Sequence, residues 1–495
     1  MAVTRSTPAL MTDSSAIPFG TGSRQRQHLA EIVAAATAAV APKTLLANRL
    51  SILPPGERLL FDGHPFPSTD CPLDLKTVEK IVVVGGGKAA AGLAAGIEQL
   101  LGPARLKAHR VKGLVSVPAG CQLPLKQIEV RETRPTGVNL PTPAVVDATS
   151  EMLAMLSQLG PHDLAIVLLT GGGSALLEAP AAGITLEFVS DITQRLSAQG
   201  ADITSLNTIR QLLSRVKAGR LAAATTAGRM LALVLSDVIG DPLPMIASGP
   251  CLPSTNSLAA ITTILNRHDL PEGSRAAVLS LVQTEALELL SPPTAAGRWL
   301  TPQGCQVDHL VLGSNATAIT AASAAAAHCG YEVVAAITDK SSTPAEEVGY
   351  RLADRGLELL ATACQLGRPL AMIEGGEATV HVPSDHGRGG RNQQTVLAAA
   401  ERSAGRAWPA GLLVASFGTD GEDGPTPAAG GVIDQMTAAA LLRNRDQLLT
   451  ALRRCDAYPL LNHCDGLIET GPTGTNVADL RLVLAHPNPT TQTRA

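Results

Sequence analysis

Two arginines stand among glycines in the segment GRGGRNQQ, which spans residues 387–394. Arginine presents a planar fork of N–H donors that matches carboxylate and phosphate oxygens, and glycine lets a backbone N–H approach an anion without a Cβ in the way. The alanine-rich run after Arg391 is typical of a helix, whose free N–H groups would add a further anion-binding element. A solvated surface turn has the same composition, so this segment alone leaves an anion site and a plain turn open.

Two further glycine runs follow short apolar segments, IVVVGGGKAA at residues 81–90 and LLTGGGSAL at residues 168–176. Each is typical of a strand, a glycine turn and the start of a helix. A lysine in the first helical turn opposes the helix dipole, so Lys88 is better explained by a bound anion than by helix stability. A lysine that only reaches solvent is the alternative. The candidate phosphate-binding or substrate-binding residues of these loops are Gly86, Gly87, Gly172, Gly173 and Ser174.

The first glycine loop also has the G-x-G-x-x-A form of the dinucleotide fingerprint, through Gly85, Gly87 and Ala90. It is not a Walker A loop, because the spacing differs and Ala89 stands where a magnesium-binding hydroxyl is needed. About twenty residues further on, the fingerprint requires an acidic residue, but the region around Arg105 is basic. NADP, with its additional phosphate, therefore stays open.

Carboxylates follow two other predicted strands. LSDVIGD at residues 235–241 places Asp237 and Asp241 four residues apart, and GTDGEDGPT at residues 418–426 carries Asp420. Carboxylates on loops at strand ends suit Mg²⁺, which keeps some of its waters and bridges to substrate phosphates. We predict Asp237, Asp241 and Asp420 as metal ligands. For each of them, a turn former that caps its own backbone is the alternative.

A third group of charges lies on a helix predicted over residues 208–224, where Arg210, Lys217 and Arg220 share one side. Such a stripe is usually a solvated face. No histidine stands in a glycine loop beside a plausible serine, as acyl transfer would require. Glycine loops, cations and carboxylates of magnesium type together form the set that phosphoryl transfer requires, since its catalysis is mostly positioning and neutralisation of charge.

Positioning these loops requires an α/β fold, because short apolar runs rich in β-branched residues alternate with helical patterns. In parallel sheets, ligands bind beyond the carboxyl ends of the strands, which is where the glycine and acidic loops fall. Strands are expected at residues 81–84, 164–169, 231–235, 309–312, 333–337 and 412–415. Helices are expected at residues 28–41, 89–101, 186–199, 208–224, 316–328, 346–364 and 393–404.

Length and composition limit the class of protein. A chain of 495 residues exceeds the usual size of a single core, so two or three domains are expected, with a connection in the Pro-rich segment near residues 290–306. A net charge of -4 and 2% aromatic residues argue against nucleic acid as a partner. The eight cysteines form no C-x-x-C pair or ladder with histidine, so neither zinc nor a disulfide framework is indicated.

The first 26 residues are rich in Ser, Thr and Arg and are expected to form a disordered extension, with a transit peptide as the alternative. No apolar run is long enough to cross a bilayer, so we expect a cytoplasmic protein without a membrane partner. A homodimer is compatible with the sequence, which does not define the oligomeric state.

Eight motifs together resemble the glycerate 2-kinases whose C-terminal half is the MOFRL domain, and they follow the family's order over residues 28–485. The motifs are GGGKAA (85–90), TGGGSALL (170–177), NTIRQLLSRVKAGRLA (207–222), LSDVIGDPLPMIASGP (235–250), GGEATV (375–380), GRGGRNQQ (387–394), GTDGEDGPTPAAG (418–430) and TGPTGTNVADL (470–480). The resemblance implies a Rossmann-like N-terminal domain with a parallel sheet, over residues 27–290, and a second α/β domain over residues 300–490. The second domain would contain the MOFRL region, at about residues 368–485, with the active site in the cleft between the domains.

The same resemblance implies ATP-dependent phosphorylation of D-glycerate at its 2-hydroxyl, giving 2-phosphoglycerate and ADP, with ATP and Mg²⁺ bound. The family's catalytic lysine falls on Lys88 and its catalytic arginine on Arg391, which would act on the transferring phosphoryl group. Arg388 or Arg210 is expected to bind the glycerate carboxylate, and Asp237 is one candidate for the base that deprotonates the 2-hydroxyl.

Two other functions stay open. An NAD(P)H-dependent hydroxypyruvate reductase would explain the dinucleotide fingerprint, but it needs a proton donor beside the carbonyl, usually a histidine, and no such site is evident. A non-catalytic sensor of nucleotides or sugar phosphates would bind ATP without turnover, and the presence of both Lys88 and Arg391 argues against it.

Overall fold

The computed structural model describes residues 23–54, 57–66, 73–135, 138–253, 256–284, 299–341 and 343–487. Residues 1–22 of the expected extension lie outside this set. Arg24, Gln25 and Arg26 form the first turn of helix α1 (Arg24–Ala39), which Ser23 caps by accepting a hydrogen bond from the backbone N–H of Arg26. Among the helices of the described ranges, none is by itself long and apolar enough to cross a membrane, and only the bent pair of α1 and α2 (Pro42–Arg49) meets that criterion together.

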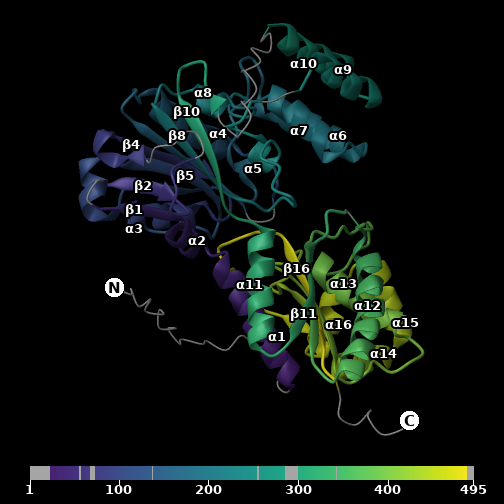
Figure 1. The fold of residues 1–495 in the computed structure, drawn as a ribbon. Helices are drawn as coiled ribbons and strands as arrows, with labels where there is room; N and C mark the ends of the chain where they lie inside the picture. Colours follow the sequence, from purple (N-terminus) through teal and green to yellow (C-terminus); the bar gives the residue numbers. More distant parts are fainter. Residues whose placement is uncertain are drawn as a thin grey trace, which may run out of the picture.

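A seven-stranded sheet forms the first body of the molecule, in the upper half of Figure 1. Its order is β6-β5-β4-β7-β8-β10-β9, and every pair is parallel except β10 with the edge strand β9. Numbered along the chain, the six parallel strands have the doubly wound order 3-2-1-4-5-6. Their bounds are β4 (Ile81–Gly86), β5 (Lys112–Pro118), β6 (Ile128–Arg134), β7 (Leu164–Leu169), β8 (Arg229–Leu235) and β10 (Gln306–Gly313), and β9 is Trp299–Leu300.

The order of this sheet reverses between β4 and β7, which are neighbours in space. Ligands of doubly wound sheets bind outside the carboxyl ends of the strands at such a reversal. Helix α3 (Ala90–Ala108) follows β4 and packs on one face, and α4 (Pro143–Ser157) packs on the other. The Rossmann-like parallel sheet expected from the sequence is therefore confirmed, and both glycine loops leave it at the reversal.

Strands β5 and β6 were not expected from the sequence. Strand β6, at one end of the sheet order, reads IEVRETR; apolar and charged residues alternate at its start because successive side chains point to opposite faces of the sheet. A search for continuous apolar runs misses such a strand. Its last residue, Arg134, therefore lies at the carboxyl ends of the parallel strands, where the glycine loops also leave the sheet.

A group of four helices extends from the first sheet and has an apolar core of its own (Figure 1). Its members are α6 (Leu186–Ala198), α7 (Ile203–Leu212), α9 (Leu258–Arg267) and α10 (Glu272–Thr284). The prediction of one helix over residues 208–224 is wrong, because α7 ends at Leu212 and α8 (Arg220–Ala223) is a separate helix. Ala218 and Gly219, with φ of 54° and 80°, have the left-handed conformation that interrupts a helix.

The second body contains a six-stranded sheet with the order β11-β12-β16-β13-β14-β15. It is mixed rather than parallel, since β16 runs antiparallel between β12 and β13. The strands are β11 (Glu332–Thr338), β12 (Leu370–Gly376), β13 (Leu412–Gly418), β14 (Gly430–Ile433), β15 (Leu467–Ile468) and β16 (Asp479–Ala485). The helices are α11 (Asn315–His328), α12 (Ala345–Leu366), α13 (Arg391–Arg402), α14 (Gln435–Leu442), α15 (Arg445–Arg453) and α16 (Ala457–His463).

Short elements complete the fold. A three-stranded sheet beside the first body consists of β1 (Leu50–Leu53), β2 (Arg58–Phe61) and β3 (Leu73–Asp74). Helix α5 (Gly173–Leu176) follows the second glycine loop, and two 3-10 turns occupy Leu75–Thr77 and Ile246–Ser248.

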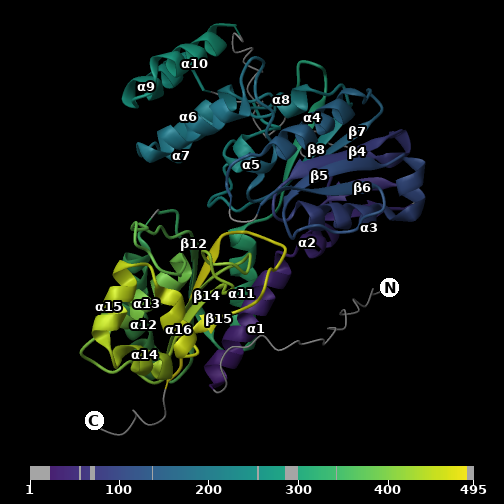
Figure 2. The ribbon, with the colours of Figure 1, turned by 180° about the vertical axis from the view of Figure 1, so that it is seen from behind.

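The chain passes between the two bodies twice, from α1 to α2 and from β10 to α11 (Figures 1 and 2). Helix α1 lies along α11 in the second body, although it is the first element of the chain. Buried residues of α1, α2, α11 and both large sheets form one continuous apolar core on this side. We propose that the bodies divide near residues 40 and 314, because β10 pairs with β8 in the first sheet.

The docking of α1 depends on a buried arginine. Nε of Arg26 lies 2.6 Å from Oδ2 of Asp434, and its Nη2 donates to Oγ1 of Thr437 at 2.6 Å. Breaking a buried pair by removing one partner leaves an uncompensated charge. We expect Arg26→Ala to lower the free energy of unfolding by about 3 kcal/mol in a urea titration. Arg24→Ala, on an exposed position of the same turn, is the control; equal stability of both variants would contradict this role.

Candidate active site

The two glycine loops pack directly on each other. The backbone N–H of Lys88 donates to the carbonyl oxygen of Gly171 at 2.9 Å, and that of Gly87 donates to the carbonyl oxygen of Ser116 at 3.1 Å. A Cβ on Gly87, whose φ is 137°, would collide with Oγ1 of Thr170. Glycine is therefore required at this position for the close approach of the loops. The first loop uses these N–H groups inside the protein and presents the side chain of Lys88.

A buried lysine, Lys217, holds the second glycine loop in place through hydrogen bonds to its carbonyl oxygens. Nζ of Lys217 donates to the carbonyl oxygens of Ser174 and Leu177, both at 2.9 Å, and lies 2.8 Å from Oε2 of Glu178. Burial lowers the pKa of Lys217, against the effect of Glu178. Gly172 enters helix α5 with φ of 79°. Lys217 thus holds the loop that carries Gly172, Gly173 and Ser174.

The second body reaches this loop at Gly171. A Cβ on Gly171 would collide with Oδ2 of Asp237 and would lie 3.0 Å from Nδ2 of Asn476. Asp237 follows β8 in the first body, whereas Asn476 precedes β16 in the second. The reversal point of the first sheet is therefore covered by the loop before β16.

Lys88 bridges the two bodies. Its Nζ lies 2.9 Å from Oδ2 of Asp420 and 2.9 Å from Oε2 of Glu422, both on the loop after β13. Partial burial would by itself lower the pKa of Lys88, but these carboxylates outweigh it and raise the pKa. The lysine is charged and held by acids of the opposite body.

Arg391 begins helix α13, two residues before the start at residue 393 that the sequence predicts. Its Nε and Nη2 donate to the two carboxylate oxygens of Asp479, at 2.6 and 2.9 Å, and its Nη1 lies 3.1 Å from Oε1 of Glu377. Burial opposes the charged guanidinium, but Asp479 and Glu377 raise its pKa. Because a bidentate pair fixes the plane of a guanidinium, Asp479 orients Arg391 toward Glu377.

Two of the first N–H groups of α13 bind a carboxylate of the protein itself, so these two are not free for the external anion that the GRGGR segment left open. The buried carboxylate of Asp423 accepts from the backbone N–H of Asn392 at 3.0 Å and from that of Gln393 at 2.8 Å. Burial raises the pKa of Asp423 to about 6, against these hydrogen bonds. The helix start is capped from within the protein by a residue three positions beyond Asp420.

Carboxylates of both bodies crowd together beside Lys88 and Arg391. Burial, and next the charge of Glu377, raise the pKa of Asp237 to about 6, and Asp420 adds to this effect. Desolvation also raises the pKa of Glu377, with contributions from Asp479 and Asp420 that oppose Arg391. We call this set the charged cluster; it consists of Lys88, Asp237, Glu377, Arg391, Asp420, Glu422 and Asp479.

The charged cluster offers the donor chemistry of Mg²⁺. Within the described ranges, no group of three or more His, Cys, Asp or Glu is already arranged around a metal position. Mg²⁺ is commonly held by one or two carboxylates together with waters and substrate phosphates, so crowded oxygens with raised pKa values fit it. Asp241 lies further along the loop of Asp237, in a left-handed turn with φ of 53°.

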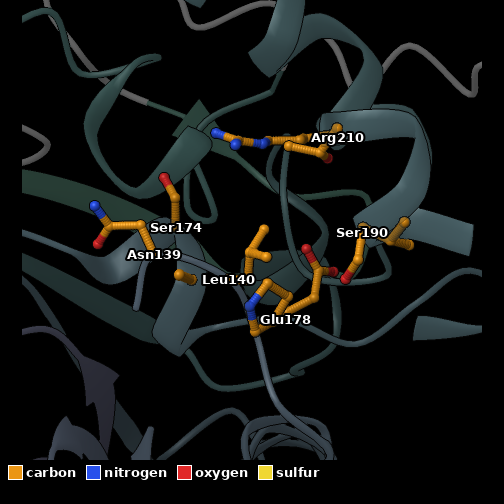
Figure 3. Close-up of a pocket in the computed structure, with 10 residues that line it drawn as sticks. Asn139, Leu140, Ser174, Glu178, Ser190 and Arg210 are labelled. Atoms are coloured by element: carbon orange, nitrogen blue, oxygen red, sulfur yellow. The ribbon is translucent and has the colours of Figure 1, made fainter. Parts of the chain in front are cut away.

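The two arginines expected to bind glycerate lie in different environments. Arg388 is exposed, with its guanidinium carbon 4.8 Å from the ring centre of Tyr458. Arg210 lines a small pocket of the first body together with Ser174 and Glu178 (Figure 3). Burial lowers the pKa of Arg210, against the effect of Glu178. Of these two arginines, Arg210 is the one that lies beside the second glycine loop.

Sequence reasoning missed Glu377 and Asp479. Both belong to motifs that had been noted, GGEATV and TGTNVADL, and both stand where a strand of the second sheet ends or begins. Because β16 runs antiparallel to β12 and β13, its first residue, Asp479, meets the carboxyl ends of those strands. That meeting could be anticipated only by knowing the strand order.

Comparison with known proteins finds relatives over nearly the whole chain. Residues 28–283 match a domain of unknown function, DUF4147, and residues 370–479 match the MOFRL family. The chain is 35% identical to glycerate kinase of Rattus norvegicus over 506 residues, or 91% of each chain. It is 33% identical to D-glycerate 2-kinase of Thermotoga maritima over 440 residues, or 89% of this chain and 98% of the relative. A crystal structure of glycerate kinase from Thermotoga maritima has a TM-score of 0.72 and 31% identity, covering 93% of this chain and 99% of that one.

Asp237→Asn tests the crowding of carboxylates. The pKa of Asp237 is raised from 3.8 to about 6 in the folded protein, so the native state holds this proton more tightly than the unfolded chain. Its stabilising effect is complete below about pH 4 and is lost as the pH rises through about 6. We expect the variant to unfold at a higher urea concentration than the wild type at about pH 8, and at the same concentration at about pH 4.

Asp191→Asn is the matched control, because Asp191 pairs with Arg195 on the outer face of α6. A difference between Asp237→Asn and wild type that stays constant across this pH range would contradict the raised pKa.

Proposed function

Because the chain belongs to the glycerate 2-kinase family, we propose that it transfers the γ-phosphoryl group of ATP to the 2-hydroxyl of D-glycerate, giving 2-phosphoglycerate and ADP. The observation that carries this proposal is the meeting of Lys88 and Arg391 with carboxylates of both bodies. Phosphoryl transfer requires such a set, since its transition state spreads negative charge over the oxygens of the transferring group.

The charged cluster suggests a role for each of its members. Asp237, Glu377 and Asp420 are the carboxylates that we place around Mg²⁺, which supplies charge neutralisation on the phosphates when bound. Loss of the partner Asp420 to the metal would leave Nζ of Lys88 with Glu422 alone and make one of its N–H donors available to a phosphate oxygen. Arg391, oriented by Asp479, would donate to the transferring group in place of Glu377. Asp237, whose pKa is raised to about 6, is alternatively the base that accepts the proton of the 2-hydroxyl, a role that it can fill only when it is not bound to Mg²⁺.

A larger cavity of the second body is the place we propose for the nucleotide base. It has a volume of about 280 Å³, lies beside Arg391 and has an apolar wall of Ala378, Val380 and Val382. Apolar walls with a few polar groups suit a planar base. From there the phosphates of ATP would extend toward Arg391 and Lys88.

The reductase alternative has lost its main support. The dinucleotide fingerprint at Gly85 and Gly87 is accounted for by packing, because a Cβ on Gly87 would collide with Thr170 and one on Gly85 would collide with Leu168. The N–H of Gly87, which a dinucleotide pyrophosphate would need, is bonded to Ser116.

Turnover of the purified protein with D-glycerate, ATP and Mg²⁺ tests the proposed function. We expect 2-phosphoglycerate, resolved from 3-phosphoglycerate by chromatography, and loss of the reaction when EDTA removes the metal. The same preparation is incubated with NADPH and hydroxypyruvate. Oxidation of NADPH without any phosphorylated product would overturn the kinase proposal in favour of the reductase.

Arg391→Ala tests the catalytic arginine. An arginine that stabilises the transferring phosphoryl group contributes about 10³ to 10⁵ in rate, so we expect turnover to fall by about that factor. The substitution also leaves Asp479, whose side chain is 1% exposed, buried without its partner. We therefore pair it with Arg391→Ala/Asp479→Asn, which should recover stability in urea while turnover stays low.

Arg402→Ala is the control for this pair, because Arg402 lies on the same helix and binds Asp354 at an exposed position. Near-wild-type turnover of the double variant would show that Arg391 does not take part in catalysis.

A further inference from the structure

Two arginines near the second glycine loop differ from Lys88 and Arg391 in having no acidic partner. Among the described residues, no carboxylate lies within ion-pair distance of Arg134 or Arg210. Lys88 and Arg391, by contrast, each bind two carboxylates. A buried charge without a partner is costly, and such groups therefore point to a ligand of opposite charge.

Arg134 is the more buried of the two. It is the last residue of β6 and is 4% exposed. Its Nη1 donates to Oδ1 of Asn139 at 3.1 Å, and its Nη2 lies 3.7 Å from the position of a Cβ on Gly172. Its Nε is buried without any hydrogen-bond partner. Burial lowers the pKa of Arg134. The guanidinium thus lies against the second glycine loop, and its Nε–H donor is not used in a hydrogen bond within the protein.

Asn139 connects Arg134 to the pocket of Arg210. The pocket is small, with a volume of about 30 Å³, and Asn139, Ser174, Glu178 and Arg210 line it. Figure 3 shows Asn139 and Ser174 on one side and Arg210 above them, with Glu178 and Ser190 on the other side. Arg210 comes from the four-helix group and Asn139 from the loop after β6, so the pocket lies between two parts of the first body.

The chemistry of this pocket favours a hydroxylated carboxylate over a triphosphate. Glu178 is 2% exposed and binds Lys217 through Oε2, but its Oε1 is buried without a partner. A carboxylate oxygen can only accept hydrogen bonds, so it suits a hydroxyl group and repels a phosphate chain. The arginines would hold the anionic end of the same small molecule, because a guanidinium matches a carboxylate through paired N–H donors.

We propose that Arg134, together with Arg210, binds the carboxylate of the acceptor substrate beside Gly172 and Ser174. This inference rests on the proposed function and adds to it the residue that distinguishes a hydroxy acid from an uncharged polyol. Arg134 is a binding residue, so its loss should weaken glycerate and leave ATP unaffected.

Calorimetric titration with D-glycerate, glycerol and ATP tests this assignment, alongside steady-state kinetics. For Arg134→Gln we expect the Kd and the KM for D-glycerate to rise by about 10- to 100-fold, as for a lost hydrogen bond to a charged group. The Kd for ATP, the weak binding of glycerol and the kcat at saturating glycerate should remain near the wild-type values. Arg134→Lys, which keeps the charge, should recover part of the affinity.

Arg131→Gln is the matched control, since Arg131 lies on the same strand and pairs with Glu129 and Glu151 at the surface. Melting temperatures identify a variant that fails to fold, in which case Arg134→Lys alone is compared with wild type. Unchanged glycerate affinity of the folded variant would overturn the inference, as would a selective loss of ATP binding.

The failure of the proposed function is distinguishable from the failure of this inference. If the wild-type protein does not phosphorylate D-glycerate, the proposed function is wrong. The role of Arg134 is then tested only by the calorimetric titrations of wild type and Arg134→Gln with D-glycerate. Equal titrations of wild type and Arg134→Gln, including the absence of binding in both, would overturn it. Phosphorylation by wild type together with an unchanged KM in Arg134→Gln would overturn only the inference.

Discussion

The ion pairs of Lys88 with Asp420 and Glu422 join the two bodies at the reversal point of the first sheet. They can form only because the carboxyl ends of β4 and β13 face each other across the bodies. The two bodies also share a continuous apolar core that includes residues of α1, α2 and α11. Apolar burial therefore sets the relative position of the bodies, and the charges meet as a result of it.

The glycines of the first loop are required for its close packing against the second loop, whether or not a ligand is bound. Gly87 allows Lys88 to donate its backbone N–H to Gly171, so the two loops form one rigid unit at the edge of the sheet. Lys217 supports this unit from beneath through the carbonyl oxygens of Ser174 and Leu177. A site built in this way presents side chains in defined positions, which electrostatic catalysis requires.

The pairing of the charges separates two kinds of cation in the site. Lys88 and Arg391 are bound by carboxylates, which a metal ion and phosphate oxygens can replace. Among the described residues, Arg134 and Arg210 have no carboxylate within ion-pair distance, and they lie on the side of the small pocket. The first kind suits a group that is transferred, and the second suits a group that is only held. On this basis we propose that the phosphoryl donor lies on the side of the second body and the acceptor within the first.

The sequence by itself determined the elements with strong local signals. Continuous apolar runs defined β4, β7 and β8, glycine runs defined the turns after two of them, and α13 starts within two residues of the predicted residue 393. The sequence also indicated the family through the order of its motifs. Tertiary structure alone decided which charges meet. Asp423 caps α13, Lys217 enters the core, and Asp479 reaches Arg391 because β16 runs antiparallel between two parallel strands. These contacts join residues far apart in the chain, and local patterns contain no information about which distant partner a charge will find.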